Sequence, residues 1–398
     1  LIDTRGKKYL DGVSSLWVTV HGHRKKEIDQ AVARQIRKIA HSTLLGLSNV
    51  PAVLLAEELV TIAPKGLSRV FYSDSGSTAV EIALKMAFQY WQQKGPQYQR
   101  KTGFLSLTEA YHGDTLGAVS VGGIDLFHSI YKPLLFQTRK IESPFCYRCK
   151  YGLTYPMCQM TCLMHAERNI QKFASVSAAL VIEPIVQGAA GMLLQPPGFL
   201  KRIREMCTRN NILMIADEVA TGFGRTGTMF ACDQEKVSPD LMAVAKGITG
   251  GYLPLAATLT TEDIYLGFLG EHKELRTFFH GLTYTGNPLA CAAAIANIDL
   301  FKKEKTLQRL KPKITYLAKR LAEVRKLTHV GEVRQKGFMV GIELVKNRLT
   351  KEPYRLEMKA GFRVVQECRK HGLIIRPLGN VIVLMPPLSL SLQELGRM

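Results

Sequence analysis

Short apolar runs bounded by turn residues recur through the middle of the chain, and stretches with helical periodicity lie between them. The apolar runs cover residues 69–73, 178–182, 212–216, 241–245 and 255–260, and helical periodicity is clearest at 79–93 and 198–209. Runs that are apolar on both faces and alternate with helices predict an α/β fold, with a mostly parallel central sheet covered by helices. Ligands of such a sheet bind at the carboxyl ends of its strands.

The C-terminal part of the chain follows a different pattern. Helical stretches at 307–325 and 356–371 alternate there with strand candidates at 337–345 and 381–385. This mixture predicts a second, smaller α+β domain. The pair Asn287-Pro288 starts a long helical stretch that could bridge the two domains.

The N-terminal stretch resembles a hairpin but has no sheet of its own nearby, so we expect it to join the smaller domain. We therefore expect three parts: residues 1–40 as the N-terminal part of the small domain, 41–287 as the large domain, and 288–398 as the C-terminal part of the small domain.

Composition and charge fit an ordinary globular protein. Hydrophobic residues make up 46% and charged residues 22% of the 398 positions. No apolar run is long enough to span a membrane, so we expect no membrane partner. The formal net charge is +20, which is typical of some nucleic-acid-binding proteins. The basic residues are nevertheless spread over helical stretches without interleaved aromatic residues, so solvated helix surfaces explain them better than a nucleic-acid partner.

Eight cysteines divide into a cluster and a scattered set. Cys146, Cys149, Cys158 and Cys162 lie close together in the sequence, whereas Cys207, Cys232, Cys291 and Cys368 are scattered among apolar or helical patterns. The scattered four are typical of reduced core thiols and favour a cytoplasmic location. The cluster allows two interpretations, a tetrahedral thiolate site for zinc and an unligated loop in a surface excursion at 146–165. A basic nucleic-acid-binding protein with this cluster as a metal module is the alternative from a different functional class.

A glycine-rich segment at 222–227 matches the spacing of dinucleotide-binding loops. Its context argues against that function, because Asp217 and Glu218 end the preceding apolar run and would repel a pyrophosphate. No helical periodicity follows the glycines, although a pyrophosphate site requires the N-terminus of a helix. We interpret the segment as a tight loop at the rim of an active site.

Three other features together predict a phosphate-bearing cofactor. The small residues 73–78 lie between a strand and a helix, where they form either a phosphate cradle or a plain helix cap. Asp217 and Lys246 each end an apolar run and so lie at the carboxyl edge of the sheet. Pyridoxal phosphate requires these three groups: an anion cradle, a carboxylate for its ring nitrogen and a lysine for its aldehyde. Tyr111 and Val219 are candidates for the two faces of the ring.

The chain resembles the class III, fold type I pyridoxal-phosphate aminotransferases over almost its whole length. The motifs that carry the resemblance are Asp74-Ser75-Gly76-Ser77, Tyr111-His112-Gly113, Glu183-Pro184, Asp217-Glu218-Val219, Thr221-Gly222-Phe223-Gly224-Arg225 and Lys246-Gly247. The family has a large domain around a mostly parallel sheet and a smaller α+β domain. The resemblance therefore implies an aminotransferase with pyridoxal 5'-phosphate bound covalently to Lys246.

The resemblance also implies individual roles. Lys246, Asp217 and Tyr111 are the implied catalytic residues. The implied cofactor-binding residues are Gly76, Ser77, Tyr111, Glu183, Asp217, Val219, Lys246, Leu282 and Thr283, with Thr283 reaching the site of the other subunit of a homodimer. The implied substrate-binding residues are Leu16, Trp17, Tyr111, Gly281 and Arg376, of which Arg376 would bind a carboxylate through its bidentate guanidinium.

Within the class, the resemblance is strongest to the branch that acts in biotin biosynthesis. Its diagnostic stretches stand here at residues 11–17, 21–23, 216–227, 279–288 and 376–379. That branch converts 8-amino-7-oxononanoate to 7,8-diaminononanoate, usually with S-adenosylmethionine as the amino donor. At Leu16, Leu282 and Val383 the chain departs from the residues that many members of that branch carry. These departures leave lysine open as an alternative donor. Another ω-amino-acid or diamine aminotransferase of the same class is the remaining alternative.

Overall fold

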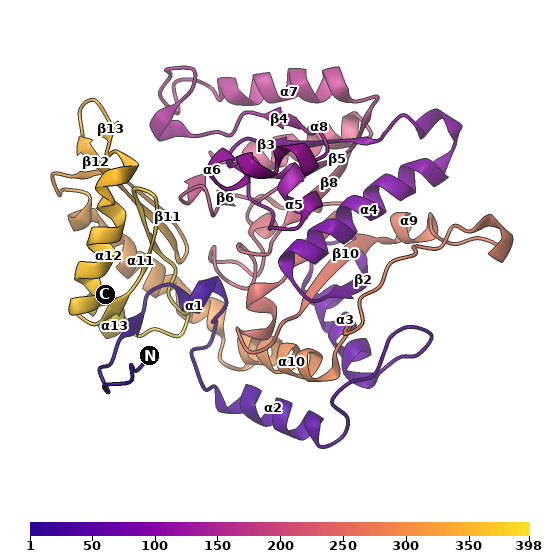
Figure 1. The fold of residues 1–398 in the computed structure, drawn as a ribbon, viewed down its shortest axis with the longest axis horizontal. Helices are drawn as coiled ribbons and strands as arrows, with labels where there is room; N and C mark the ends of the chain where they lie inside the picture. The colour runs from indigo at the N-terminus through magenta and orange to yellow at the C-terminus, as the bar shows by residue number, and fades with distance from the viewer.

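The computed structural model describes all 398 residues, and its centre is a seven-stranded sheet (Figure 1). The strand order is β2 (Leu67–Ser73), β10 (Ala256–Thr261), β9 (Leu241–Val244), β8 (Leu213–Asp217), β5 (Ser177–Ile182), β3 (Gly103–Leu107) and β4 (Arg139–Ile141). Strand β10 pairs antiparallel with both neighbours, and every pair from β9 to β4 is parallel. The mostly parallel sheet expected from the apolar runs is thereby confirmed.

Both faces of this sheet are buried, which explains why its strands are apolar without alternation. On β8, Met214 and Ala216 belong to one hydrophobic cluster, and Leu213 and Ile215 belong to a second one. The second cluster contains the inner face of α4 (Gly76–Lys94). The first contains residues of α3 (Val50–Ile62), α7 (Thr161–Phe173) and α8 (Phe199–Arg209). Helices therefore cover the sheet on both sides.

A second, antiparallel sheet lies at one side of the molecule, near both chain ends (Figure 1). Its strand order is β11 (Val330–Lys336), β12 (Met339–Asn347), β16 (Val381–Leu384) and β15 (Arg376–Leu378), with β13 (Glu352–Pro353) paired to β12. The helices beside it are α11 (Thr306–Val324), α12 (Ala360–Lys370) and α13 (Leu392–Arg397). The N-terminal β1 (Leu10–Asp11) pairs in parallel with β14 (Leu373–Ile374). The N-terminal segment thus pairs with a C-terminal one, while the division into domains stays a prediction.

A long helix connects the two sheets. Helix α10 (Pro288–Lys303) begins where the sequence predicted, because the side chain of Asn287 accepts hydrogen bonds from the backbone N–H groups of Leu289 and Ala290. It packs against α2 (Lys26–Ile36) and α3. Shorter elements complete the fold: α1 (Ser14–Trp17), α5 (Leu116–Val121), α6 (Asp125–His128), α9 (Glu262–Leu266), β6 (Val186–Gln187) and β7 (Leu193–Leu194). None of the helices combines the length and the hydropathy that crossing a bilayer requires.

Two expected elements differ from those observed. The helical stretch expected at 356–371 is interrupted at Lys359, which has a left-handed φ of 50°, so α12 begins only at Ala360. The strand expected to begin at residue 337 begins at Met339, because Gly337 has a φ of 61° and forms the turn that leads into it. Both differences are local backbone reversals that hydrophobic periodicity does not encode.

Candidate active site

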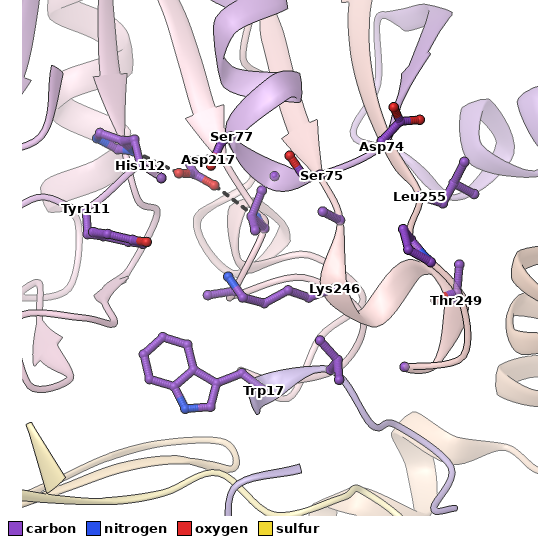
Figure 2. A pocket seen from close by; sticks show the side chains of 18 of the residues that line it. Trp17, Asp74, Ser75, Ser77, Tyr111, His112, Asp217, Lys246, Thr249 and Leu255 are labelled. Carbon is purple, nitrogen blue, oxygen red and sulfur yellow. Dashed lines mark hydrogen bonds and ion pairs between the residues drawn. The ribbon is translucent and has the colours of Figure 1, made fainter. Parts of the chain in front are cut away.

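One cavity of about 400 Å³ opens at the carboxyl edge of the seven-stranded sheet (Figure 2). Its lining includes eight of the residues expected at the site: Trp17, Gly76, Ser77, Tyr111, Glu183, Asp217, Val219 and Lys246. Asp217 ends β8, Glu183 directly follows β5, and Lys246 follows β9 by two positions. Strand ends that are far apart in the sequence therefore meet at one place, as the topology of a parallel sheet requires.

The first turn of α4 forms an anion cradle at this cavity. Ser75 caps the helix, since its hydroxyl accepts from the N–H of Thr78 and the Thr78 hydroxyl accepts from the N–H of Ser75. The first N–H groups of a helix have no partner within it and carry the positive end of its dipole. The cap is observed, and because it leaves other N–H groups of the turn unpaired, a phosphate site at the same turn is compatible with it and stays a prediction.

Two glycines let the cradle come this close to its neighbours. A Cβ atom at Gly76 would lie 2.6 Å from Cγ1 of Val219, and one at Gly113 would lie 2.1 Å from Oγ of Ser77. Gly113 also has a φ of 123°, which side-chain-bearing residues rarely adopt. Val219 is thereby packed directly against the cradle, where it can contact one face of a flat ring.

Asp217 is buried and has one strong partner. Its Oδ2 lies 2.8 Å from Nδ1 of His112, and its Oδ1 accepts a hydrogen bond of 3.0 Å from the N–H of Val219. The His112 side chain is buried too, and its Nε2 has no hydrogen-bond partner. A buried carboxylate held in this way needs a further cation or a protonated nitrogen nearby.

His112 is a site residue that the sequence analysis did not assign a role. It stands within the Tyr111-His112-Gly113 motif, but its contact with Asp217 joins positions 105 residues apart. A polar residue directly beside an expected site residue was the available signal. Its burial and its partner depend on how β3 and β8 are placed in the sheet.

Lys246 projects into the cavity between Asp217 and Trp17 (Figure 2). No hydrogen bond or ion pair within the chain uses its Nζ, and desolvation lowers its pKa, an effect that Asp217, Glu183 and Asp114 partly oppose. An amine with a lowered pKa is more often uncharged, and the uncharged form is the nucleophile and the proton acceptor.

Glu183 positions Tyr111. One carboxylate oxygen accepts a 3.0 Å hydrogen bond from the N–H of Tyr111, and the other accepts a 2.8 Å bond from the N–H of Gly188. Burial raises the pKa of Glu183 to about 7, and His112 acts in the opposite direction. The Tyr111 hydroxyl in turn donates a 2.7 Å hydrogen bond to Asp114. Tyr111 is therefore fixed at both its backbone and its hydroxyl.

Five expected site residues do not line this cavity. Leu16 points to solvent, Gly281 and Thr283 are exposed, Leu282 is half-buried, and Arg376 is exposed at the start of β15. Arg376 is still near enough for its charge to lower the pKa of Tyr111, against the larger effect of burial. Residues that serve a second subunit would be exposed in a single chain, so the roles of Gly281, Leu282 and Thr283 stay predictions.

The cysteine cluster forms a loop with a cavity of only about 20 Å³ between its side chains. All four cysteines line it, but no group of three or more His, Cys, Asp or Glu side chains in the chain is arranged to hold a metal ion. His165, the spare ligand candidate, stacks on Tyr151 with ring centroids 4.6 Å apart. Whether the four thiols bind a metal ion or form an unligated loop stays a prediction.

We expect protein purified without a chelator to carry substoichiometric zinc and iron, and its denatured form to titrate eight free thiols. Elemental analysis combined with a thiol assay checks both numbers. Burial raises the pKa of Cys146 to about 11, so we also expect slow alkylation of this thiol in the native protein at pH 7. One tightly held metal ion per chain after gel filtration would contradict the unligated loop.

The buried amine of Lys246 destabilises the folded protein when no cofactor is bound. Its pKa lies below the ordinary 10.5 in the folded chain, so at neutral pH the unfolded chain binds a proton that the folded chain disfavours. We expect Lys246→Met apoprotein to melt about 2 °C or more above wild-type apoprotein at pH 7. The difference should shrink as the pH approaches 10.5, which thermal unfolding at several pH values measures.

Lys319, an exposed residue of α11, provides the matched control, because Lys319→Met should leave the melting temperature almost unchanged. A wild-type apoprotein as stable as Lys246→Met at pH 7 would show that desolvation of this amine is negligible.

Comparison with known proteins places this geometry in a family. The family described as aminotransferase class-III matches residues 1–397. Adenosylmethionine-8-amino-7-oxononanoate aminotransferase of Geobacter sulfurreducens is 56% identical, over 99% of this chain and 87% of the relative. The protein of the same name from Nitratidesulfovibrio vulgaris is 58% identical, over 99% of this chain and 73% of the relative.

Solved structures agree with the sequence relatives. The structure of adenosylmethionine-8-amino-7-oxononanoate aminotransferase from Methanocaldococcus jannaschii matches with a TM-score of 0.94 and 49% identity, over 99% of this chain and 88% of that one. An amine transaminase from an uncultivated Pseudomonas species, solved in its PLP-bound form, matches with a TM-score of 0.94 and 38% identity, over 100% of this chain and 90% of that one.

Proposed function

The chain belongs to the class-III aminotransferases, and from this premise we propose that it transfers an amino group to 8-amino-7-oxononanoate, forming 7,8-diaminononanoate in biotin biosynthesis, with S-adenosylmethionine as the donor. The observation that carries the proposal is the meeting of Lys246, the Asp217–His112 pair and the first turn of α4 around one cavity. The names of relatives that are 48–58% identical support the acceptor and the donor.

Pyridoxal phosphate fits the residues of this cavity. The cradle at Ser75, Gly76 and Ser77 would hold its phosphate, and Asp217 would keep its ring nitrogen protonated, with His112 fixing the carboxylate. Val219 and Tyr111 would contact the ring. When bound, the cofactor supplies an electron sink for the substrate carbon. Covalent attachment through Nζ of Lys246 is part of the proposal.

Lys246 has two tasks in this scheme. Its Nζ would hold the cofactor through the aldehyde carbon, and it would give up this position to the donor amine. The same Nζ would then be the base that accepts a proton from the amine-bearing carbon of the donor and returns it on the cofactor side. The lowered pKa of Lys246 favours this role, since the amine must be uncharged to accept the proton.

Substrate recognition in this scheme uses Trp17 in the cavity and Arg376 outside its lining. Trp17 lines the cavity and offers an apolar surface for the carbon chain of the acceptor. Arg376 would bind the terminal carboxylate of the acceptor as a bidentate partner. Both side chains come from segments that pair with each other through β1 and β14.

The enzyme acts as a homodimer in this proposal. The exposed segment Gly281–Thr283 would complete the cofactor site of the second subunit, where the Thr283 hydroxyl adds a donor to the phosphate. The absence of a nucleic-acid partner is also a prediction, and a gel-shift assay at low salt checks it.

A donor screen tests the proposed reaction. The purified protein, loaded with pyridoxal phosphate, is incubated with 8-amino-7-oxononanoate and with S-adenosylmethionine, lysine or another amine, and the diamine is quantified by mass spectrometry. We expect the fastest diamine formation with S-adenosylmethionine. Faster diamine formation with lysine would show that lysine, and not S-adenosylmethionine, is the donor, while the proposed acceptor would stand. No diamine with any donor, together with transfer to another ω-oxo acid, would replace the acceptor as well.

A further inference from the structure

Trp17 stands on a strained turn. Its indole ring lies 5.8 Å from Nζ of Lys246, and the residue is 7% exposed. Three non-glycine residues of this turn have left-handed φ angles: 53° at Ser14, 60° at Ser15 and 66° at Trp17. Such angles cost roughly 1–2 kcal/mol per residue in L-amino acids. The turn therefore persists only because other contacts hold it in place.

The carboxylate of Asp11 supplies two of those contacts. Oδ1 accepts a 3.2 Å hydrogen bond from the N–H of Val13, and Oδ2 accepts a 2.8 Å bond from the N–H of Ser15. Oδ2 also lies 2.9 Å from Nε2 of His23. Asp11 is 6% exposed, and its charge acts on the buried guanidinium of Arg225, whose pKa it raises against the larger effect of burial. One buried side chain thus holds the N-terminal half of the strained segment, and the N–H of Trp17 donates a 2.8 Å hydrogen bond to the carbonyl oxygen of Val13 within the same turn.

The same turn is fastened to the strand that leads to Arg376. Asp11 pairs with Ile374, and the N–H of Gly12 donates a 2.8 Å hydrogen bond to the carbonyl oxygen of that residue. The Ser14 hydroxyl donates a 2.7 Å bond to the carbonyl oxygen of Met385, which follows β16. The backbone around Asp11 therefore ties the segment carrying Trp17 to the one carrying Arg376, and the Asp11 carboxylate holds the turn that follows.

We propose that Asp11 is a positioning residue, which holds the Trp17 turn against Lys246 and thereby sets the affinity of the site for its acceptor. It touches neither the cofactor cradle nor Lys246, so it acts through Trp17. The inference rests on the proposed function for its effect on the acceptor, but the position of Trp17 can be measured without any substrate.

Asp3 offers a matched control on the same N-terminal segment. Its Oδ1 accepts hydrogen bonds of 2.9 Å from the N–H groups of Arg5 and Lys7, and its Oδ2 accepts one from the Tyr9 hydroxyl. This is the same kind of carboxylate-held turn, and it lies away from the cavity. A variant of Asp3 therefore loses a comparable turn without touching Trp17.

The first measurement uses the fluorescence of Trp17 in the protein without cofactor. The chain has only two tryptophans, so Trp91→Phe leaves Trp17 as the single indole. We expect Asp11→Ala in this background to raise acrylamide quenching of Trp17 at least about twofold, whereas Asp3→Ala leaves it unchanged. Ser15→Gly should restore part of the protection in Asp11→Ala, because glycine adopts the required φ without strain.

The second measurement separates binding from chemistry in the loaded enzyme. We expect Asp11→Ala to raise the KM for the acceptor about tenfold, with kcat lowered less than about threefold. Unchanged quenching and unchanged KM in a folded Asp11→Ala protein would overturn the proposal. If Asp11→Ala fails to fold, Asp11→Asn, which keeps one acceptor oxygen, must show an intermediate shift in both measurements or the proposal fails.

The two measurements also keep this inference separate from the proposed reaction. If no diamine forms, but Asp11→Ala exposes Trp17 and Asp3→Ala does not, the proposed reaction is refuted. The role of Asp11 in positioning the Trp17 turn then still holds. If the diamine forms, but the quenching of Trp17 does not change in Asp11→Ala, the proposed reaction holds and the positioning role of Asp11 is refuted.

Discussion

Replacing Lys246 with alanine should lower the rate of amino transfer by about a thousandfold or more. In the proposed scheme the variant loses both the amine that would hold the cofactor and the base that would move the proton, and these two contributions have no substitute in the cavity. No other lysine lines it. Diamine formation under saturating donor and acceptor measures the loss.

Lys101 is the matched control for this variant. Burial lowers the pKa of Lys101 to about 8, and it also lowers the pKa of Lys246, so the two amines are similar in this respect. Lys101, however, donates hydrogen bonds to the carbonyl oxygens of Ala174 and Ser177 and does not line the cavity. Lys101→Met should keep most of the turnover of the folded protein. Turnover in Lys246→Ala within a factor of about ten of wild type would refute its assignment as the catalytic lysine.

Replacing Asp217 with asparagine should lower kcat about a hundredfold or more, without removing the cavity. The amide has nearly the shape of the carboxylate but no charge, so it cannot keep a ring nitrogen protonated, and the electron sink is weakened. The hydrogen bond to His112 can survive in the variant, which limits the structural damage. Steady-state kinetics, with the visible spectrum as a check of cofactor loading, measures the effect.

Asp125→Asn is the control for this charge change, because Asp125 is largely exposed and pairs with Lys132 on the surface. It should behave as wild type. Asp217→Asn that loads cofactor normally and retains half of the wild-type kcat would show that the carboxylate charge is not needed.

The main sheet and the strand-end residues were predictable because they follow from periodicity. An apolar run that ends in a charged residue marks both a strand and its edge, and Asp217 and Lys246 carried this signal. The anion cradle was predictable in type, since small hydroxyl residues before a helix act as caps and as anion donors alike. In the structure Ser75 caps the helix, and the N–H groups of the turn that it caps can still donate to an anion.

The supporting contacts were not predictable from the same patterns. His112 meets Asp217, and Asp11 holds the Trp17 turn, through backbone geometry and long-range placement that hydrophobic periodicity does not record. The family resemblance implied that Leu16 and Trp17 both bind substrate. In the structure Trp17 lines the cavity, whereas Leu16, its neighbour on the left-handed turn, is exposed.

The measurement that tests the central proposal most directly is a single turnover that needs no donor. The protein is first loaded with the amine form of the cofactor, freed of excess, and then mixed with 8-amino-7-oxononanoate alone. We predict one 7,8-diaminononanoate per cofactor-loaded site, released as the visible absorption of the aldehyde form returns. A fully loaded protein that yields no diamine and whose spectrum does not change would contradict the assignment of this chain as the aminotransferase for that acceptor.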